Sequence, residues 1–104
     1  MNSQILENQI NQAGHLTIGG VDTVELAKKY GTPLVVYDVE QIRNQIRAFK
    51  KVFEEENVKY AVSYASKAFA CIAMYQVAAA EGAYTDVVSD AELYTALKAH
   101  FPVE

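Results

Sequence analysis

The sequence is poor in several features, and each shortage argues against a class of protein. A single cysteine, Cys71, excludes an internal disulfide and fits a reducing, cytoplasmic compartment. It has no histidine or cysteine partner at metal-ligand spacing, so no metal site is predicted, and a small core side chain is the favoured role. The nine basic residues form no stripe interleaved with aromatics, and the net charge is −4, which argues against a nucleic-acid partner.

Long hydrophobic runs are also missing. The richest apolar stretch, residues 68–80, is interrupted by Gln76 and is too short to span a bilayer. Residues 1–12 are polar and lack the basic start and apolar centre of a signal peptide. We therefore expect no membrane partner.

Apolar β-rich runs and amphipathic stretches alternate along the rest of the chain. Strands are predicted at residues 34–37, 58–63 and 86–88. Helices are predicted after Asp22, after Asp38, over residues 69–81 and after Ser89, and three of them begin with capping-box spacing. This order predicts an α/β fold with parallel strands and right-handed crossovers. A chain of 104 residues makes one domain at most and cannot close an eight-stranded barrel.

Lys67 stands at the junction between a predicted strand and an apolar helix. Burial between two apolar elements would favour its neutral amine, which is the form that attacks an aldehyde. The alternative is an ordinary solvated lysine, because buried lysines are rare. The carboxyl ends of parallel strands carry the active site in such folds, so Lys67 and Asp86 are predicted to share one edge and to lie close enough to pair.

Three segments carry a family resemblance. Residues 64–69 read Tyr-Ala-Ser-Lys-Ala-Phe, residues 82–97 read Gly-Ala-Tyr-Thr-Asp-Val-Val-Ser-Asp-Ala-Glu-Leu-Tyr-Thr-Ala-Leu, and residues 31–38 read Gly-Thr-Pro-Leu-Val-Val-Tyr-Asp. Together they resemble diaminopimelate decarboxylase, a family of pyridoxal-phosphate enzymes built on an alanine-racemase-like barrel. The resemblance runs from about Gly14 to the last residue.

The resemblance implies the N-terminal part of a pyridoxal-phosphate-binding (β/α)8 barrel, truncated after its first units. Residues 1–33 would be an N-terminal segment with one helix, and residues 34–104 the entry strand and first βα units. The implied reaction is decarboxylation of meso-2,6-diaminopimelate to L-lysine, by a full-length homodimer. An ornithine or arginine decarboxylase of the same fold, and a non-catalytic α/β segment, remain open as alternatives. The family's phosphate loop and substrate-binding arginine would lie beyond residue 104, so this stretch alone is expected to be inactive.

The resemblance also implies roles for individual residues. Lys67 would hold pyridoxal 5′-phosphate covalently and later shuttle a proton to the decarboxylated carbon. Asp86 and Glu92 would line the cofactor pocket, and Tyr64 and Ala65 would pack beside the ring. Glu92 is equally well explained as the acid of a capping box.

Two departures from the family pattern bear on this pocket. Asp90 and Ala91 stand where relatives often have two glycines, and Phe69 stands where many have asparagine. The added side chains would either narrow the pocket or be accommodated at the start of a helix.

Overall fold

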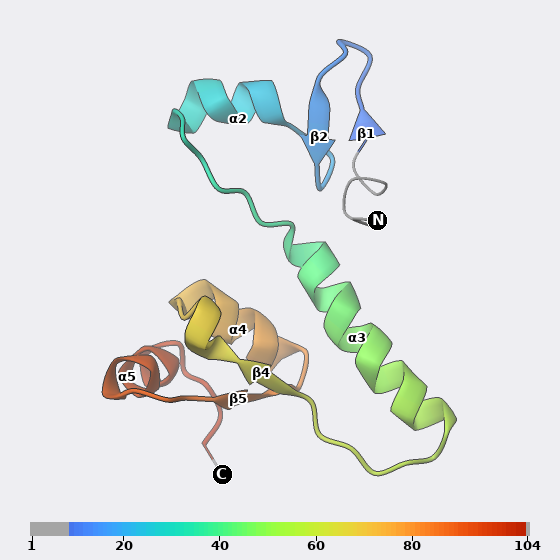
Figure 1. Ribbon diagram of the computed structural model, residues 1–104, viewed down its shortest axis with the longest axis vertical. Coiled ribbons are helices and arrows are strands. Elements are labelled where there is room, and N and C mark those ends of the chain that lie inside the picture. The colour runs from blue at the N-terminus through green and yellow to red at the C-terminus, as the bar shows by residue number, and fades with distance from the viewer. Residues whose placement is uncertain (1–8, 104) are drawn as a thin grey trace. The chain divides into compact units, whose positions relative to one another are not determined.

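The computed structural model describes residues 9–103, which fall into two compact units divided after Gln41 (Figure 1). Within residues 9–41, the first unit shows three short strands and a helix: β1 (Gln9–Ile10), β2 (Leu16–Ile18), β3 (Val21–Asp22) and α2 (Thr23–Tyr30). Helix α3 (Val39–Glu55) begins in the first unit and continues into the second. The second unit then adds β4 (Ser63–Ala65), the 3-10 turn η1 (Ser66–Ala68), α4 (Ile72–Ala80), β5 (Tyr84–Asp86) and α5 (Asp90–Lys98). Among residues 9–103, no helix is both long enough and apolar enough to cross a membrane.

The first unit is an antiparallel sheet of order β1-β2-β3 followed by α2. Gly19 and Gly20 join β2 to β3 with φ of 57° and 78°, which is the left-handed backbone that a two-residue hairpin turn requires. The helix predicted after Asp22 is present. The sheet was not predicted, because its strands are too short to show a two-residue alternation.

Asp22 connects the sheet to α2. As the N-cap residue, its carboxylate accepts hydrogen bonds from the backbone N–H groups of Val24 (2.8 Å) and Glu25 (3.4 Å). The same carboxylate accepts from Asn11 Nδ2 at 2.8 Å and lies 2.9 Å from His15 Nδ1. The hydrogen bond from His15, supported by those from Asn11, Val24 and Glu25, lowers the pKa of Asp22 from 3.8 to about 2.

This lowered pKa predicts an acid-sensitive first unit. Because the folded-state pKa lies below the ordinary value, the stabilisation is complete above about pH 4 and is lost as the pH falls through about 2. We expect the amide NMR signals of Val24 and Glu25 to report this loss on acidification. The control is Asp22→Asn, which keeps an acceptor oxygen at the cap but has no carboxylate to protonate. An unchanged acid transition in Asp22→Asn would contradict the assignment to Asp22.

The strand predicted at residues 34–37 is not formed. Residues 34–37 have no regular secondary structure and belong to neither sheet found in residues 9–103, and Leu34, Val35 and Tyr37 are exposed. The prediction used the β-rich composition of the segment. A strand also needs the backbone of a second strand beside it, and composition does not supply one.

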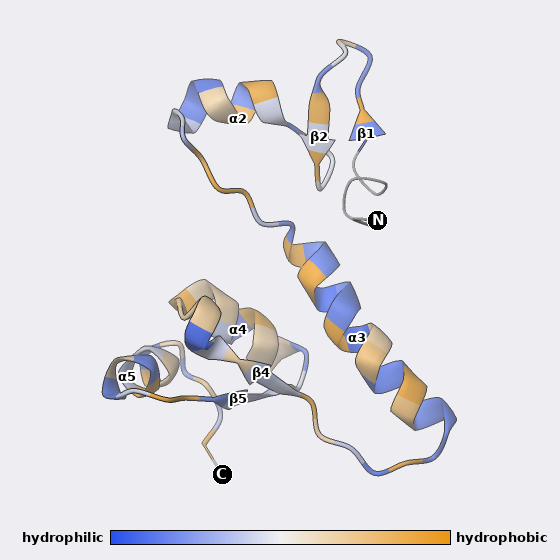
Figure 2. Ribbon diagram, in the orientation of Figure 1, coloured by the Kyte–Doolittle hydropathy of each residue, from blue (hydrophilic) through white to orange (hydrophobic). Residues whose placement is uncertain are grey.

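Helix α3 carries alternating apolar and charged stripes (Figure 2). The predicted cap is present, since Asp38 Oδ1 accepts from the Gln41 N–H at 3.2 Å. We also predicted that one face of α3 would cover the sheet. Instead none of its residues is buried, and Phe49 is 61% exposed. The β4–β5 pair has three residues in each strand, which is too small a surface to bury one face of a helix of 17 residues.

Charged contacts tie α3 to the end of α4. The Arg47 guanidinium donates to both carboxylate oxygens of Glu81, at 2.9 and 2.8 Å, and Lys50 Nζ donates to the Glu81 carbonyl at 2.9 Å. The hydrogen bond from Arg47 lowers the pKa of the Glu81 carboxyl group. These cations also offset the partial negative charge at the carboxyl end of α4, and Lys50 supplies a hydrogen-bond donor to a carbonyl there.

Strands β4 and β5 pair in parallel, with Tyr64 opposite Thr85 and Ala65 opposite Asp86, which confirms the predicted parallel pairing. Their positions differ from the prediction: β4 begins at Ser63 rather than residue 58, and β5 ends at Asp86 rather than beginning there. Helix α4 makes the crossover and packs against α5 and β5. The buried apolar residues come from these helices and the segments that follow them, and one cluster among them joins Tyr75 to Ala96 and Ala99, with Phe101 packed against it.

Cys71 was predicted to be a small core side chain, but it is only partly buried. It is the residue before α4, at the N-cap. The helix expected over residues 69–81 begins three residues later, at Ile72, because residues 69–71 follow η1 without helical structure and Cys71 has an extended backbone.

Candidate active site

Lys67 and Asp86 lie at the same edge of the β4–β5 pair. Asp86 is the last residue of β5, and its register partner Ala65 is the last residue of β4. Lys67 follows two residues later, in the middle of η1. The sequence therefore predicted correctly that both residues lie at the carboxyl ends of neighbouring parallel strands.

Four hydrogen bonds hold the backbone around Lys67. Ser66 is fully buried, and its Oγ donates to the Asp86 carbonyl at 2.7 Å. The Tyr64 hydroxyl donates to the Phe69 carbonyl at 2.6 Å, and the Phe69 N–H donates to the Ser66 carbonyl at 3.0 Å. Thr85 Oγ1 donates to the Tyr64 carbonyl at 3.1 Å, between the two strands. The turn is thus fixed both within itself and to β5.

The Lys67 side chain is exposed and, within the described residues, forms no ion pair. The predicted pairing with Asp86 is therefore wrong. The Asp86 carboxylate accepts instead from Ser63 Oγ at 3.0 Å. Both groups are exposed, and an ion pair between solvated side chains gains little free energy. Of the two possibilities for Lys67, the structure shows the solvated lysine, and the buried side chain at this turn is that of Ser66.

The other predicted site residues have local partners. Tyr64 is half-buried, with its hydroxyl on the Phe69 carbonyl, and Ala65 is exposed at the strand end. Glu92 Oε2 accepts from the Val88 N–H at 2.6 Å, and the Glu92 N–H donates to Ser89 Oγ at 3.2 Å. The capping interpretation of Glu92 is therefore realised, one residue displaced from the usual box.

Asp90 and Ala91, which replace the family's glycines, form the first turn of α5 and are exposed. Of the two possibilities for these side chains, the structure shows accommodation at the start of a helix. Phe69 lies after η1 and is half-buried.

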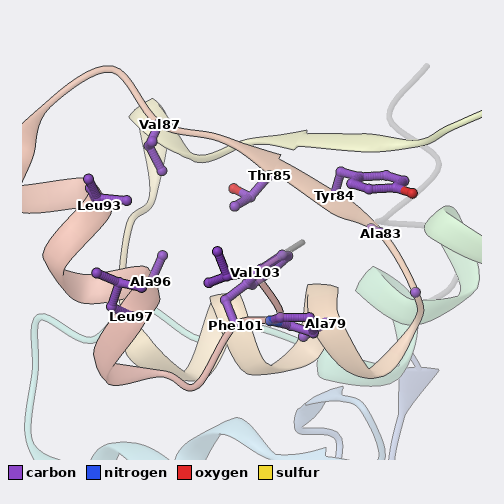
Figure 3. Close-up of a pocket in the computed structure, with 12 residues that line it drawn as sticks. Ala79, Ala83, Tyr84, Thr85, Val87, Leu93, Ala96, Leu97, Phe101 and Val103 are labelled. Atoms are coloured by element: carbon purple, nitrogen blue, oxygen red, sulfur yellow. The ribbon is translucent and has the colours of Figure 1, made fainter.

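A separate apolar cavity of about 400 Å³ lies between β5, α5 and the segment 101–103 (Figure 3). Thr85, Leu93 and Phe101 are among the residues that line it, whereas Lys67 and Asp86 are not. This cavity is therefore distinct from the strand edge that carries the lysine.

The lysine edge has the chemistry that pyridoxal phosphate needs at its aldehyde end. The Lys67 side chain is exposed and has no carboxylate partner among the described residues, so an aldehyde can approach its amine without breaking an ion pair. The Asp86 carboxylate lies at the same edge. We find no conflict between these residues and the cofactor that the resemblance implies.

Sequence reasoning missed Ser66. A small polar residue between Ala65 and Lys67 has no periodicity or spacing that marks it as buried. Its partner carbonyl lies 20 residues away in the sequence, so the contact leaves no local signal.

Comparison with known proteins gives consistent results. Diaminopimelate decarboxylase from Bacillus methanolicus is 61% identical over 95 residues, which is 91% of this chain and 22% of that protein. The Bacillus subtilis enzyme is 57% identical over 94 residues, or 90% and 21% of the two chains. A crystal structure of diaminopimelate decarboxylase from M. jannaschii in complex with L-lysine matches with a TM-score of 0.74 at 40% identity, covering 91% of this chain and 23% of that one. The chain spans about a fifth of the length of the curated relatives it matches.

The structural match confirms the predicted fold class, the N-terminal part of a pyridoxal-phosphate-binding α/β barrel. The sequence family described as "Pyridoxal-dependent decarboxylase, pyridoxal binding domain" matches residues 39–104. These residues contain Lys67 and both parallel strands. With these matches and the lysine at the carboxyl edge of β4, the chain belongs to the pyridoxal-dependent decarboxylases.

Proposed function

We propose that this chain supplies the cofactor-binding lysine of an enzyme that decarboxylates meso-2,6-diaminopimelate to L-lysine. The observation that carries the proposal is the Lys67 amine, exposed and without an ion pair among the described residues, at the end of a parallel strand pair. The choice of substrate rests on the relatives, which are named diaminopimelate decarboxylases. We expect an amino-acid substrate and a homodimer for the full-length enzyme.

The residues of this chain have distinct parts in that reaction. Lys67 Nζ would bond to the aldehyde carbon of pyridoxal phosphate with loss of water and would be released when the substrate amine takes its place. The freed Lys67 amine would then carry a proton to the carbon that has lost carbon dioxide. Asp86 would present a carboxylate to the same edge, oriented by the hydrogen bond from Ser63. When bound, the pyridoxal ring supplies the electron sink for the carbanion left by decarboxylation. Tyr64 and Ala65 would flank the ring. Glu92 would line the cofactor pocket in addition to capping α5.

Covalent labelling tests this assignment. The full-length protein is mixed with pyridoxal phosphate, reduced with borohydride, digested, and analysed by mass spectrometry for the modified peptide. We expect one modified lysine, Lys67, together with a new absorbance band before reduction. The exposed lysines Lys59 and Lys98 serve as internal controls for nonspecific reaction.

Equal modification of Lys59, Lys98 and Lys67 would contradict a dedicated cofactor site. Substrate identity is tested separately, by the release of carbon dioxide from meso-diaminopimelate, ornithine and arginine. Faster release from ornithine or arginine would retain the cofactor assignment and overturn the proposed substrate.

A further inference from the structure

We propose that Ser66 is a positioning residue that sets the place of the Lys67 amine, an inference that rests on the proposed function. Ser66 directly precedes Lys67 and is fully buried, whereas Lys67 is exposed. The Ser66 Oγ donates to the Asp86 carbonyl at 2.7 Å, from one strand end to the other. This hydrogen bond therefore holds the lysine turn to the edge of β5 that also presents the Asp86 carboxylate.

The other hydrogen bonds found at the turn have different acceptors. Those donated by the Tyr64 hydroxyl and the Phe69 N–H go to carbonyls within residues 64–69, so these two bonds fix the shape of the turn. Thr85 Oγ1 bonds across the strands to the Tyr64 carbonyl, before the lysine turn begins. Of the side-chain hydrogen bonds found in the described residues, that of Ser66 is the one that joins η1 to β5.

Loss of the Ser66 hydroxyl has two consequences. It leaves the Asp86 carbonyl without this donor, which lowers stability. It also frees the turn to shift relative to β5. The Lys67 amine then samples several positions and spends less time close enough to the aldehyde of pyridoxal phosphate to react with it. The second consequence is the one that a positioning role predicts and that a purely structural role does not.

The test compares three variants of the full-length protein with the wild type. Ser66→Ala removes the hydroxyl, and Ser66→Cys keeps a side chain of similar shape with a much weaker donor. Thr85→Val is the matched control, because it removes a hydroxyl that donates to the Tyr64 carbonyl at 3.1 Å and to the Asp86 carbonyl at 3.4 Å, while the Ser66 hydroxyl and its shorter bond from η1 stay in place. Each protein is mixed with pyridoxal phosphate, and the rate of borohydride-trapped modification at Lys67 is measured per folded molecule. Thermal unfolding without the cofactor gives the folded fraction.

We expect the labelling rate of Ser66→Ala to fall about tenfold, the equivalent of one buried hydrogen bond. Ser66→Cys should lie between Ser66→Ala and the wild type, and Thr85→Val should keep the wild-type rate. If Ser66→Ala does not fold, Ser66→Cys decides the question in the same way. A wild-type rate in the folded Ser66 variants, or an equal loss in Thr85→Val, would overturn the positioning role while leaving the proposed function intact. A wild type that does not label at Lys67 would overturn the proposed function, and this inference with it.

Discussion

Replacing Lys67 by alanine in the full-length protein is expected to lower the rate of diaminopimelate decarboxylation by roughly 10³-fold or more, the scale seen when a covalent catalytic group is lost. The variant lacks both the amine that binds the aldehyde and the group proposed to carry the proton. The fold should be unaffected, because the Lys67 side chain is exposed and forms no ion pair with the described residues. Carbon dioxide release measures activity, and urea unfolding measures stability.

Lys59→Ala is the matched control for this experiment. Lys59 is also exposed and lies on the approach to β4, but it is outside the lysine turn. We expect it to keep wild-type activity. Appreciable decarboxylation by Lys67→Ala would end the assignment of Lys67, and a large loss in Lys59→Ala would show that the effect is one of general surface charge.

The largest expected effect on stability comes from Tyr75→Ala. Tyr75 is fully buried and packs against Ala96, Ala99 and the edge of the Phe101 ring, with ring centroids 6.2 Å apart. Truncating a buried aromatic residue to alanine costs about 3–5 kcal/mol, because apolar contacts are lost and a cavity is left. That is a large share of the roughly 5–15 kcal/mol that stabilises a typical domain. Urea unfolding of the full-length protein measures the change.

Two further variants separate packing from hydrogen bonding. The Tyr75 hydroxyl is buried and has no hydrogen-bond partner within the described residues, so Tyr75→Phe should be neutral or stabilising. Tyr94→Ala, at an exposed tyrosine of α5 near Lys98, should cost about 1 kcal/mol or less. A large loss in Tyr75→Phe would reveal a partner for the hydroxyl, and a small loss in Tyr75→Ala would show that this core is not essential.

Local signals in the sequence were read correctly. Asp22, Asp38 and Ser89 were each predicted to begin a helix, and each accepts a backbone N–H in that position. Capping joins residues two or three apart, so the sequence alone contains the whole interaction. The strand-helix-strand order around Lys67 similarly indicated parallel pairing, because a helical crossover brings the next strand back in the same direction.

Interactions between distant residues were not predictable in the same way. Residues 34–37 have strand composition but belong to neither sheet found in residues 9–103, and no residue of α3 is buried. The Ser66 hydroxyl donates to the Asp86 carbonyl, and the Asp86 carboxylate accepts from Ser63 rather than from Lys67. Each of these outcomes is decided by a neighbour in space that local sequence does not identify.

The parallel pairing of β4 and β5 also has a consequence for folding kinetics. Tyr64 and Thr85, opposite one another in the ladder, are 21 residues apart, and α4 lies between them. Closing the chain between these two residues costs conformational entropy before any β4–β5 hydrogen bond forms to offset it. The β4–β5 pair is therefore slow to form compared with a hairpin. Formation of α4 shortens the span that remains to be closed. We therefore expect the lysine turn to become ordered late, and substitutions that weaken α4 to slow its appearance even where they leave the native turn unchanged.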